Sequence, residues 1–347
     1  MSKKVTMAQI AAAAGVSQPT VSLVLNGAAE TARITAQTQR KVLEAAQRLG
    51  YQRLNRPMSD GSRRIALVLD GSIITNDHFI TALNEANERA NELGLTLCQL
   101  DTAGNDKGRA LVRAEINSGL YAGVIIATNV TSELMSDFSS TVPQVYLNCI
   151  PRNNFEVCAI LPDDYGASYE LAAALASRYR HPLIVAGDEW MRATSDRCRA
   201  IRDAYLAEGI EIDGSHIIYT SWSFKDAFTK TVAALTAQQG TLASKEAGLS
   251  SGERPDVILC GSDFLATAVY QAIYYAGLKI PQDIAVAGFD DQPLASNLVP
   301  ELTTVELPYA QMGALAVDML LQGMMQPEAS WRKIQRIKGQ LMLRAST

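Results

Sequence analysis

From residue 65 onward, short apolar segments alternate with stretches of helical periodicity, and this alternation restricts the fold more than any other feature of the chain. The predicted strands are Ile65–Leu69, Leu95–Leu100, Gly123–Ala127, Gln144–Leu147, Leu183–Ala186, Ile217–Tyr219, Val257–Cys260 and Ile284–Ala287. Strands separated by helices form parallel sheets that helices cover on both faces. About 280 residues of this pattern exceed what one such sheet needs, so we expect two α/β lobes.

The first 50 residues have a different pattern, which predicts three short helices. Thr6, Ser17 and Thr35 stand where helix N-caps are expected, while Gly15 and Gly50 stand at helix ends. A helix, a short glycine-containing turn and a second helix with polar residues at its N-terminus form the helix-turn-helix pattern. The second helix of such a unit enters the DNA major groove, where hydroxyl groups and helix N-termini bind phosphates. The alternative is a three-helix cluster that serves only as a structural cap.

The charge of the chain is unevenly divided along its length. Residues 1–64 contain ten Lys and Arg against three Asp and Glu, a net charge of +7, although the whole chain carries −5. The remaining residues therefore carry −12. A small basic segment on a large acidic body is typical of a chain whose first domain meets a polyanion. The alternative is a basic face that is only solvated.

Several classes of protein are excluded by the residue patterns. No apolar run approaches the roughly 18 residues of a membrane span. The first residues mimic a signal peptide, but their apolar stretch is short and lacks a clear cleavage site, so we expect no membrane association and a cytoplasmic location. The five cysteines are scattered and without C-x-x-C spacing, which favours core residues in a reducing compartment. The three histidines lie far apart, and no P-loop, G-x-G-x-x-G, G-x-S-x-G or H-E-x-x-H occurs. We therefore expect neither an enzyme nor a bound metal or other cofactor.

The run VTMAQIAAAAGVSQPTVSLVLNG at 5–27, with RKVLEAA at 40–46 and LGY at 49–51, resembles the DNA-binding headpiece of the LacI/GalR (lac repressor) family. The resemblance implies that the two residues after the capping serine, Gln18 and Pro19, read base edges. A glutamine can pair with adenine, whereas a proline offers only apolar contact, for instance to a thymine methyl group. The resemblance also implies phosphate contacts at Thr6, Ser17, Thr20, Ser22, Asn26 and Lys41. Leu23 stands where most members carry a base-reading arginine, so we expect an unusual operator sequence.

The connection at residues 51–63 is rich in Arg, Asn, Ser and Gly. The family resemblance implies a hinge helix here that inserts an apolar side chain into the DNA minor groove. Met58 stands in the place of that inserting side chain. Pro57 fits only the first turn of a helix, so any hinge helix is very short or absent. The alternative is a flexible linker.

Ligands of two-lobed α/β folds bind in the cleft at the carboxyl ends of the strands. Side chains that follow the predicted strands are therefore the candidate effector contacts: Asp70, Phe79, Arg192, Arg197, Trp222, Asp263 and Phe289. A guanidinium, a carboxylate and an indole suit a neutral polyol, whose hydroxyls need donors and acceptors while its C–H faces stack. The alternatives are that Arg197 belongs to a structural ion pair and that Asp290 and Asp291 cap turns.

Four later segments resemble the effector-binding core of the same family, which is similar to periplasmic sugar-binding proteins. They are GSDFLA at 261–266, AGLKIPQDIAVAGFDD at 276–291, LTTV at 302–305 and LRAST at 343–347. The resemblance implies effector contacts by Arg197 and Asp263 and three crossovers between the lobes. Because no leucine-heptad helix follows the LRAST segment, we expect a homodimer.

We therefore expect an all-α helix-turn-helix headpiece at residues 1–50, a hinge or linker at 51–63 and a periplasmic-binding-protein-like α/β core of two parallel-sheet lobes at 64–347. The first lobe is expected at about 64–161 plus 290–322. The second is expected at about 162–289 plus 323–347.

The expected function is that of a sequence-specific transcriptional regulator, a repressor, that binds a pseudo-palindromic double-stranded DNA operator. A small-molecule effector, a sugar or sugar derivative held between the lobes, is expected to control it. One alternative is a cytoplasmic small-molecule-binding protein with degenerate DNA reading, which Leu23 and Pro57 favour. Another, a sugar-modifying enzyme, has only fold analogy behind it.

Overall fold

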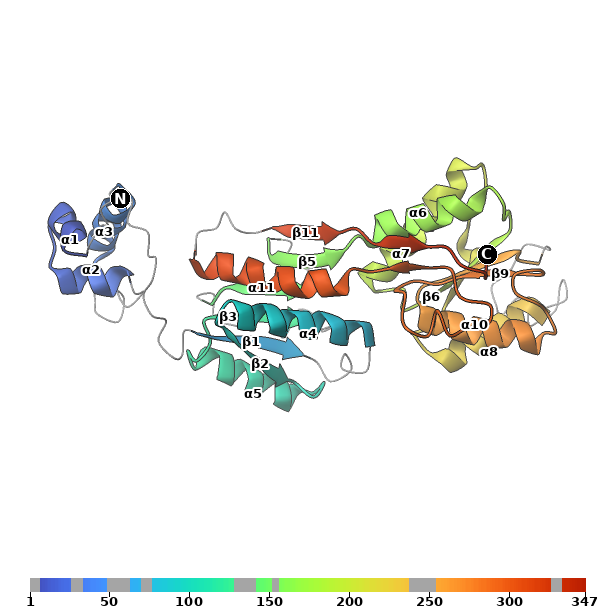
Figure 1. Ribbon diagram of the computed structural model, residues 1–347, viewed down its shortest axis with the longest axis horizontal. Helices are drawn as coiled ribbons and strands as arrows, with labels where there is room; N and C mark the ends of the chain where they lie inside the picture. The colour runs from blue at the N-terminus through green and yellow to red at the C-terminus, as the bar shows by residue number, and fades with distance from the viewer. Residues whose placement is uncertain are drawn as a thin grey trace. The chain divides into compact units, whose positions relative to one another are not determined.

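The computed structural model describes residues 7–25, 34–48, 63–69, 77–127, 142–151, 156–236, 254–325 and 333–347. The chain forms two compact units, residues 1–59 and residues 60–347. The described residues of the first unit form helices, and the second unit contains the sheets (Figure 1). None of the helices in these ranges is long and apolar enough to cross a membrane.

The first unit has the three predicted helices, α1 (Met7–Ala14), α2 (Gln18–Leu25) and α3 (Ala36–Arg48). Each helix contributes a fully buried side chain to one small core: Ile10, Val21 and Val42. These residues recur on one face of their helices, which is why the helices pack against one another although each is short.

Side-chain caps begin α2 and α3 as the sequence predicts. Ser17 Oγ accepts a hydrogen bond from the backbone N–H of Thr20 at 3.3 Å, and Thr35 Oγ1 accepts one from Thr38 at 3.3 Å. Both bonds satisfy a donor that has no partner within its own helix. The predicted cap Thr6 and the linker at 51–62 lie outside the described residues.

The first lobe of the second unit is built on a six-stranded parallel sheet in the order β11-β5-β4-β3-β1-β2. Its strands are β1 (Arg64–Leu69), β2 (Thr96–Asp101), β3 (Gly123–Ala127), β4 (Gln144–Leu147), β5 (Cys158–Pro162) and β11 (Ile334–Ile337). Its helices are α4 (Asp77–Glu92), α5 (Asp106–Asn117) and α11 (Tyr309–Met325). Helices α4 and α11 pack against each other and run side by side in Figure 1. A Cβ at Gly313 of α11 would lie 2.0 Å from the carbonyl oxygen of Ala82 in α4, so the glycine permits this close approach.

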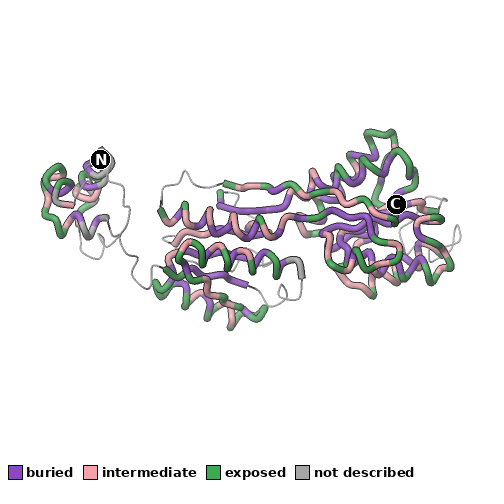
Figure 2. The backbone as a smooth tube through the Cα atoms, in the orientation of Figure 1, coloured by how far each residue is buried: buried purple, intermediate pink, exposed green. Residues whose placement is uncertain are grey.

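The second lobe has a four-stranded parallel sheet in the order β7-β6-β8-β9. Its strands are β6 (Pro182–Ala186), β7 (Ile217–Tyr219), β8 (Val257–Cys260) and β9 (Ala285–Ala287). Its helices are α6 (Asp164–Ala176), α7 (Arg192–Ala207), α8 (Phe224–Thr236) and α10 (Asp263–Tyr275), with a short 3-10 turn, η2 (Gly214–His216). Helix α6 packs on α7, and α8 packs on α10. Buried backbone follows the strands in Figure 2, as expected for sheets covered on both faces.

The chain passes between the lobes at residues 162–164, 303–309 and 337–343. Two of these passages are short strands, β10 (Thr304–Glu306) and β12 (Gln340–Met342), which pair in antiparallel register with Val305 opposite Leu341. Beyond β12 the chain returns to the second lobe, where Ser346 Oγ donates to the carbonyl oxygen of Val286 at 2.6 Å.

The α/β fold class is confirmed, but the division into lobes differs from the expected one. Strand β11 belongs to the sheet of the first lobe, although 323–347 was expected in the second. Residues 290–303 stay with the second lobe, because Ala295 and Leu302 are part of its core. Neither segment is an apolar run, so the sequence pattern had no signal for placing them.

Candidate functional site

The carboxyl ends of β6, β8 and β9 meet at one edge of the second lobe, and two helices begin there. Asp163 caps α6, since its Oδ1 accepts from the N–H of Gly166 at 3.1 Å. Ser262 caps α10 in the same way through the N–H of Leu265 at 3.2 Å. Each cap is followed directly by an aspartate in the first helical turn, Asp164 and Asp263, which are both buried. The caps therefore hold two carboxylates at the edge where the strands end.

Arg197 of α7 is the centre of this edge and is only 8% exposed. Its Nε donates to Asp164 Oδ1 at 2.8 Å, and its Nη2 lies 2.8 Å from the same oxygen. Its Nη1 donates to the carbonyl oxygen of Gly261 at 2.5 Å. Nη2 also lies 3.7 Å from Asp290 Oδ1, and the guanidinium carbon stands 3.8 Å from the ring centroid of Phe289. Burial alone lowers the pKa of Arg197, but attraction by Asp164 and Asp290 outweighs burial, so the pKa is raised and the charge is retained.

A side chain of the first lobe takes part in the same cluster. The hydroxyl of Tyr309, the first residue of α11, hydrogen-bonds to Asp290, and burial raises its pKa well above the usual value for tyrosine. Asp290 follows β9 in the second lobe. The Arg197 cluster is therefore linked through Asp290 to a helix of the first lobe.

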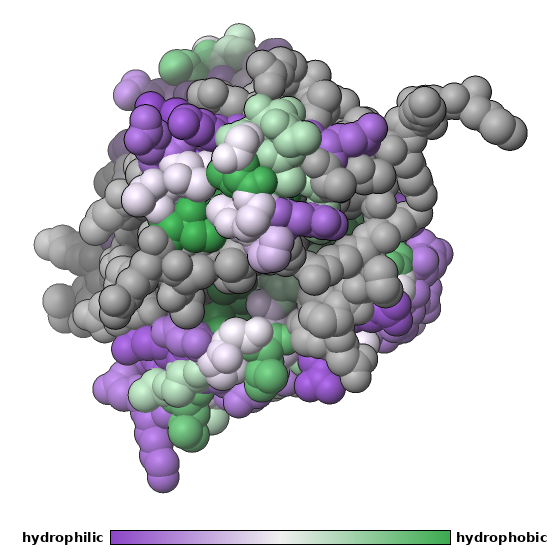
Figure 3. Space-filling model, turned by 90° about the vertical axis from the view of Figure 1, so that its left-hand side faces the viewer, coloured by the Kyte–Doolittle hydropathy of each residue, from purple (hydrophilic) through white to green (hydrophobic). Residues whose placement is uncertain are grey.

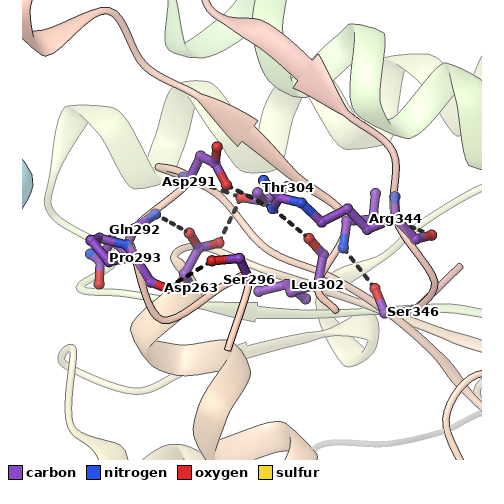
Figure 4. Close-up of polar contacts among 10 residues, drawn as sticks. Asp263, Asp291, Gln292, Pro293, Ser296, Leu302, Thr304, Arg344 and Ser346 are labelled. Atoms are coloured by element: carbon purple, nitrogen blue, oxygen red, sulfur yellow. Dashed lines mark hydrogen bonds and ion pairs between the residues drawn. The ribbon is translucent and has the colours of Figure 1, made fainter. Parts of the chain in front are cut away.

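Asp263 is fully buried and forms a second cluster beside the first. Its Oδ1 is 2.6 Å from Thr304 Oγ1, and its Oδ2 accepts from the backbone N–H of Gln292 at 2.7 Å (Figure 4). Burial, followed by repulsion from Asp290, raises the pKa of Asp263 to about 8. Because Thr304 belongs to the crossing strand β10, this carboxyl group ties α10 to a passage between the lobes.

Arg344 holds the end of the chain against this cluster (Figure 4). Its Nη1 lies 2.7 Å from Asp291 Oδ1 and donates to the carbonyl oxygen of Leu302 at 2.9 Å. Ser346 Oγ accepts from the N–H of Thr303 at 2.8 Å. The alternative that Arg197 belongs to a structural ion pair agrees with its pairing with Asp164, and Asp291, for which a turn cap was the alternative, is paired with Arg344.

Trp222 covers the end of β6 from the loop after β7. Its indole lies against Gly187, since a Cβ there would be 2.0 Å from Trp222 Cε2. Its Nε1 donates to Met191 Sδ at 2.9 Å. Ser221 and Trp222 both have a positive φ, +46° and +55°, so the loop is held in a conformation that L-residues seldom adopt.

The structure brings three of the predicted effector contacts together. Arg197, Trp222 and Phe289 line one pocket between α6, α7 and the ends of β6 and β8. Asp263 lies outside the pocket lining, in the neighbouring cluster. Two others lie elsewhere: Arg192 is exposed and pairs with Asp196 at 3.4 Å, and Phe79 is buried in α4. Asp70 lies outside the described residues.

Residues that the sequence reasoning did not select complete the site. Asp164 is the partner of Arg197, and its signal was its position directly after a strand, β5, that was not predicted. The adjacent carboxylates of Asp163 and Asp164 have different partners, since one caps α6 and the other pairs with Arg197. Ser168 and Thr194 had no signal in the pattern, because serine and threonine inside helices are common, whereas Thr304 lies in the LTTV segment that resembles the family's core.

The first unit exposes the residues predicted to read DNA. Ser17, Gln18 and Pro19 are exposed at the start of α2, and Lys41 is exposed on α3. Thr20 is half-buried, and its hydroxyl bonds to Ser17 Oγ at 2.8 Å. Ser22 and Leu23 lie on α2, whereas Thr6, Asn26 and Met58 fall outside the described residues. Figure 3 shows hydrophilic and hydrophobic side chains next to each other on the face of the molecule that it presents.

Two family matches cover different parts of the chain. Residues 6–53 match the bacterial regulatory proteins of the lacI family. Residues 172–347 match the periplasmic binding protein-like domain.

Relatives of known name match nearly the whole chain. The HTH-type transcriptional regulator DegA of Bacillus subtilis (strain 168) is 29% identical over 321 residues, covering 90% of this chain and 89% of that protein. The ribose operon repressor of Escherichia coli (strain K12) is 27% identical over 339 residues, covering 95% and 96%.

Solved structures agree in fold. A transcriptional regulator CelR–cellobiose complex superposes with a TM-score of 0.71 at 21% identity, covering 99% of this chain and 100% of that one. The lac repressor dimer bound to operator and the anti-inducer ONPF superposes with a TM-score of 0.66 at 22% identity, covering 99% of each chain.

Proposed function

The chain belongs to the lacI family of bacterial regulatory proteins, and from this membership we propose that it is a sequence-specific transcriptional repressor controlled by a small-molecule effector. As a member of a family of regulatory proteins, it is not an enzyme. The observation that carries the proposal is the linkage of the Arg197 pocket in the second lobe to the first lobe, through Asp290 and Tyr309. A ligand that changes this cluster changes the contacts on which the angle between the lobes depends.

The DNA side of the proposal rests on the exposed start of α2. Gln18 and Pro19 contact base edges there, while Ser17, Thr20 and Ser22 bind phosphates with Lys41 of α3. Leu23 gives apolar contact in the groove, and Thr6, Asn26 and Met58 are assigned to DNA on the family pattern alone. A homodimer places two such units on successive major grooves, roughly 34–36 Å apart, so the operator is pseudo-palindromic.

The effector side rests on the pocket of Arg197, Trp222 and Phe289. The indole and phenyl rings offer flat faces for the C–H groups of a sugar, and the neighbouring carboxylates accept its hydroxyls. Asp70, Phe79, Arg192 and Asp263 are further contacts in the proposal. Relatives named as ribose and sucrose operon repressors, and a structural neighbour solved with cellobiose, support a sugar or sugar derivative.

Effector binding would control DNA affinity by favouring one arrangement of the lobes. A coupling free energy of about 1–3 kcal/mol is enough for a 5–150-fold change in operator affinity. The site of action is the bacterial cytoplasm, at the nucleoid when the protein is bound to DNA.

The test begins with selection of DNA from a random library by the full-length protein. We expect an enriched pseudo-palindrome, and its affinity, measured by fluorescence anisotropy, should change when the effector is added. Trp222→Ala should bind this DNA as the wild type does and lose the response to the effector. Arg197→Ala should lose the response as well. Trp190→Ala is the matched control, because that tryptophan is 57% exposed outside the pocket lining.

Two results would contradict the proposal. One is DNA binding that weakens with salt but does not discriminate among sequences. The other is a normal effector response in both pocket variants.

A further inference from the structure

Two buried hydroxyl groups in the pocket have no hydrogen-bond partner among the residues that the structure describes. They belong to Ser168 of α6, which is 1% exposed, and Thr194 of α7, which is 2% exposed. A buried polar group without a partner costs about 1–3 kcal/mol, and such groups are rare in folded proteins. Both residues line the pocket that contains Arg197. The two hydroxyl groups are thus available to hydrogen-bond to a ligand in the pocket.

The remaining wall of the pocket around these hydroxyls is apolar. Leu171 comes from α6, Ile201 from α7, and Ile184 and Leu259 from the sheet. The pocket has a volume of about 10 Å³, which is the room that one water-sized group needs. A hydroxyl on a carbon skeleton matches this combination of small size, apolar surface and two hydrogen-bonding partners, whereas a charged group would lose its hydration without compensation.

The charges beside the pocket oppose an anionic ligand. Both terminal nitrogens of Arg197 and its Nε are already engaged by protein oxygens, and its face is covered by Phe289. Asp164 and Asp290 flank it, and the Asp291 carboxylate close by is already paired with Arg344. A phosphate or carboxylate would have to displace Asp164 and then remain beside Asp290 in a buried environment, where like charges repel strongly.

We propose that the effector is an uncharged hydroxylated molecule that places one hydroxyl between Ser168 and Thr194, next to Arg197, and that phosphorylated and carboxylated analogues are excluded. The inference rests on the proposed function, because it concerns the same pocket. It adds the charge of the ligand and the two side chains that bind its innermost hydroxyl.

The charge selectivity is tested with matched compounds and the full-length protein. Calorimetric titration and thermal unfolding would compare ribose with ribose 5-phosphate, glucose with glucose 6-phosphate and gluconate, and the disaccharides sucrose and cellobiose. We expect at least one uncharged compound to bind and raise the unfolding midpoint, and its charged counterpart to bind at least tenfold more weakly. A panel in which only charged compounds bind, or in which no uncharged compound binds, overturns the proposal.

The hydroxyl contacts are tested with Ser168→Ala and Thr194→Val and the uncharged compound that binds. Each variant should bind this compound about fivefold more weakly, because each loses one hydrogen bond to it. Neither unliganded variant should be less stable than the wild type, because each removes a buried hydroxyl that has no partner there. Ser195→Ala, at an exposed position of the same helix, is the control and should bind normally.

Two results would overturn the proposed hydroxyl contacts. One is wild-type affinity for the compound in both variants. The other is a loss of unfolding free energy in both unliganded variants that equals their loss of binding free energy. Failure of the proposed function would be distinguishable, since it appears as the absence of sequence-specific DNA binding whatever the pocket binds. If DNA is released by a phosphorylated sugar, the function stands and this inference falls.

Discussion

Replacement of Asp263 by asparagine should change the free energy of unfolding in a pH-dependent way. Compared with the wild type, the variant should be more favourable at pH 8 than at pH 5. The side chain is fully buried, and its pKa is raised from 3.8 to about 8 by burial and by Asp290. Between pH 5 and pH 8 the folded wild type therefore keeps a proton that the unfolded chain has released. Stability from this group is fully present below the unfolded pKa and is lost as the pH rises through the folded pKa. The loss amounts to about 4 kcal/mol between pH 5 and pH 8.

Asparagine carries no titrating proton, and its amide can replace the protonated carboxyl. The oxygen can accept from the N–H of Gln292, and the amide group can donate to Thr304, whose hydroxyl also accepts. The difference in unfolding free energy between Asp263→Asn and the wild type should thus change by about 4 kcal/mol in favour of the variant from pH 5 to pH 8.

Urea unfolding followed by tryptophan fluorescence at pH 5, 6, 7 and 8 measures this difference. Asp213→Asn is the control, because hydrogen bonds from Ser215 and His216 lower the pKa of Asp213 to about 2, so it should show no change over this range. Parallel pH profiles for Asp263→Asn and the wild type would refute the reasoning, since they would mean that Asp263 is already ionised at pH 5.

Three further predictions concern other contacts. Arg197→Met alone should lower the free energy of unfolding by about 3–5 kcal/mol, because it leaves a buried carboxylate unpaired. In a double-mutant cycle, Arg197→Met combined with Asp164→Asn should lower it by much less than the sum of the two single effects. Strict additivity in urea unfolding would contradict this. Gly313→Ala should cost about 1–3 kcal/mol in the same assay, because its Cβ would meet the carbonyl oxygen of Ala82, and an unchanged midpoint would show that α4 and α11 can move apart freely. Lys41→Ala should weaken binding to all DNA sequences alike and lower the slope of log affinity against log salt by about 1, whereas loss at one sequence only would argue against a phosphate contact.

The sequence pattern predicted eight of the strands, each from a short run of mostly apolar residues. Strands β3, β4, β7 and β8 have the predicted bounds, and β1, β2, β6 and β9 differ by one residue at one or both ends. One missed strand, β5, is apolar and buried like the predicted ones. The other missed strands have other compositions. Strand β11, at the edge of its sheet, has two polar residues between two isoleucines, and β10 and β12 belong to the passages between the lobes. Their pairing depends on partners far away in the chain, which a local pattern does not contain.

The site was predictable where strand ends and family motifs marked it, as for Arg197, Trp222 and Phe289. Arg192 shows the limit of this reasoning. It follows the same strand as Arg197, but the two lie five residues apart on α7, so the helix turns one side chain into solvent and the other into the pocket. The role of Thr304 could not be seen from the sequence, because it depends on which strand crosses beside α10.

The path of residues 333–347 through both lobes has a consequence for synthesis on the ribosome. The helices of the first unit are complete once residue 48 has emerged, whereas β11 and the Ser346 contact to Val286 must wait for nearly all of the remaining chain. At about 5–20 residues per second, this leaves an interval of roughly 15–60 s in which the basic unit exists without a finished sensor. A protein translated from a message that ends before codon 333 would lack strand β11 of the first sheet and the Ser346 contact to Val286 in the second. Such a product would have two damaged lobes, and quality control by proteases would have to remove it before it occupied DNA without regulation.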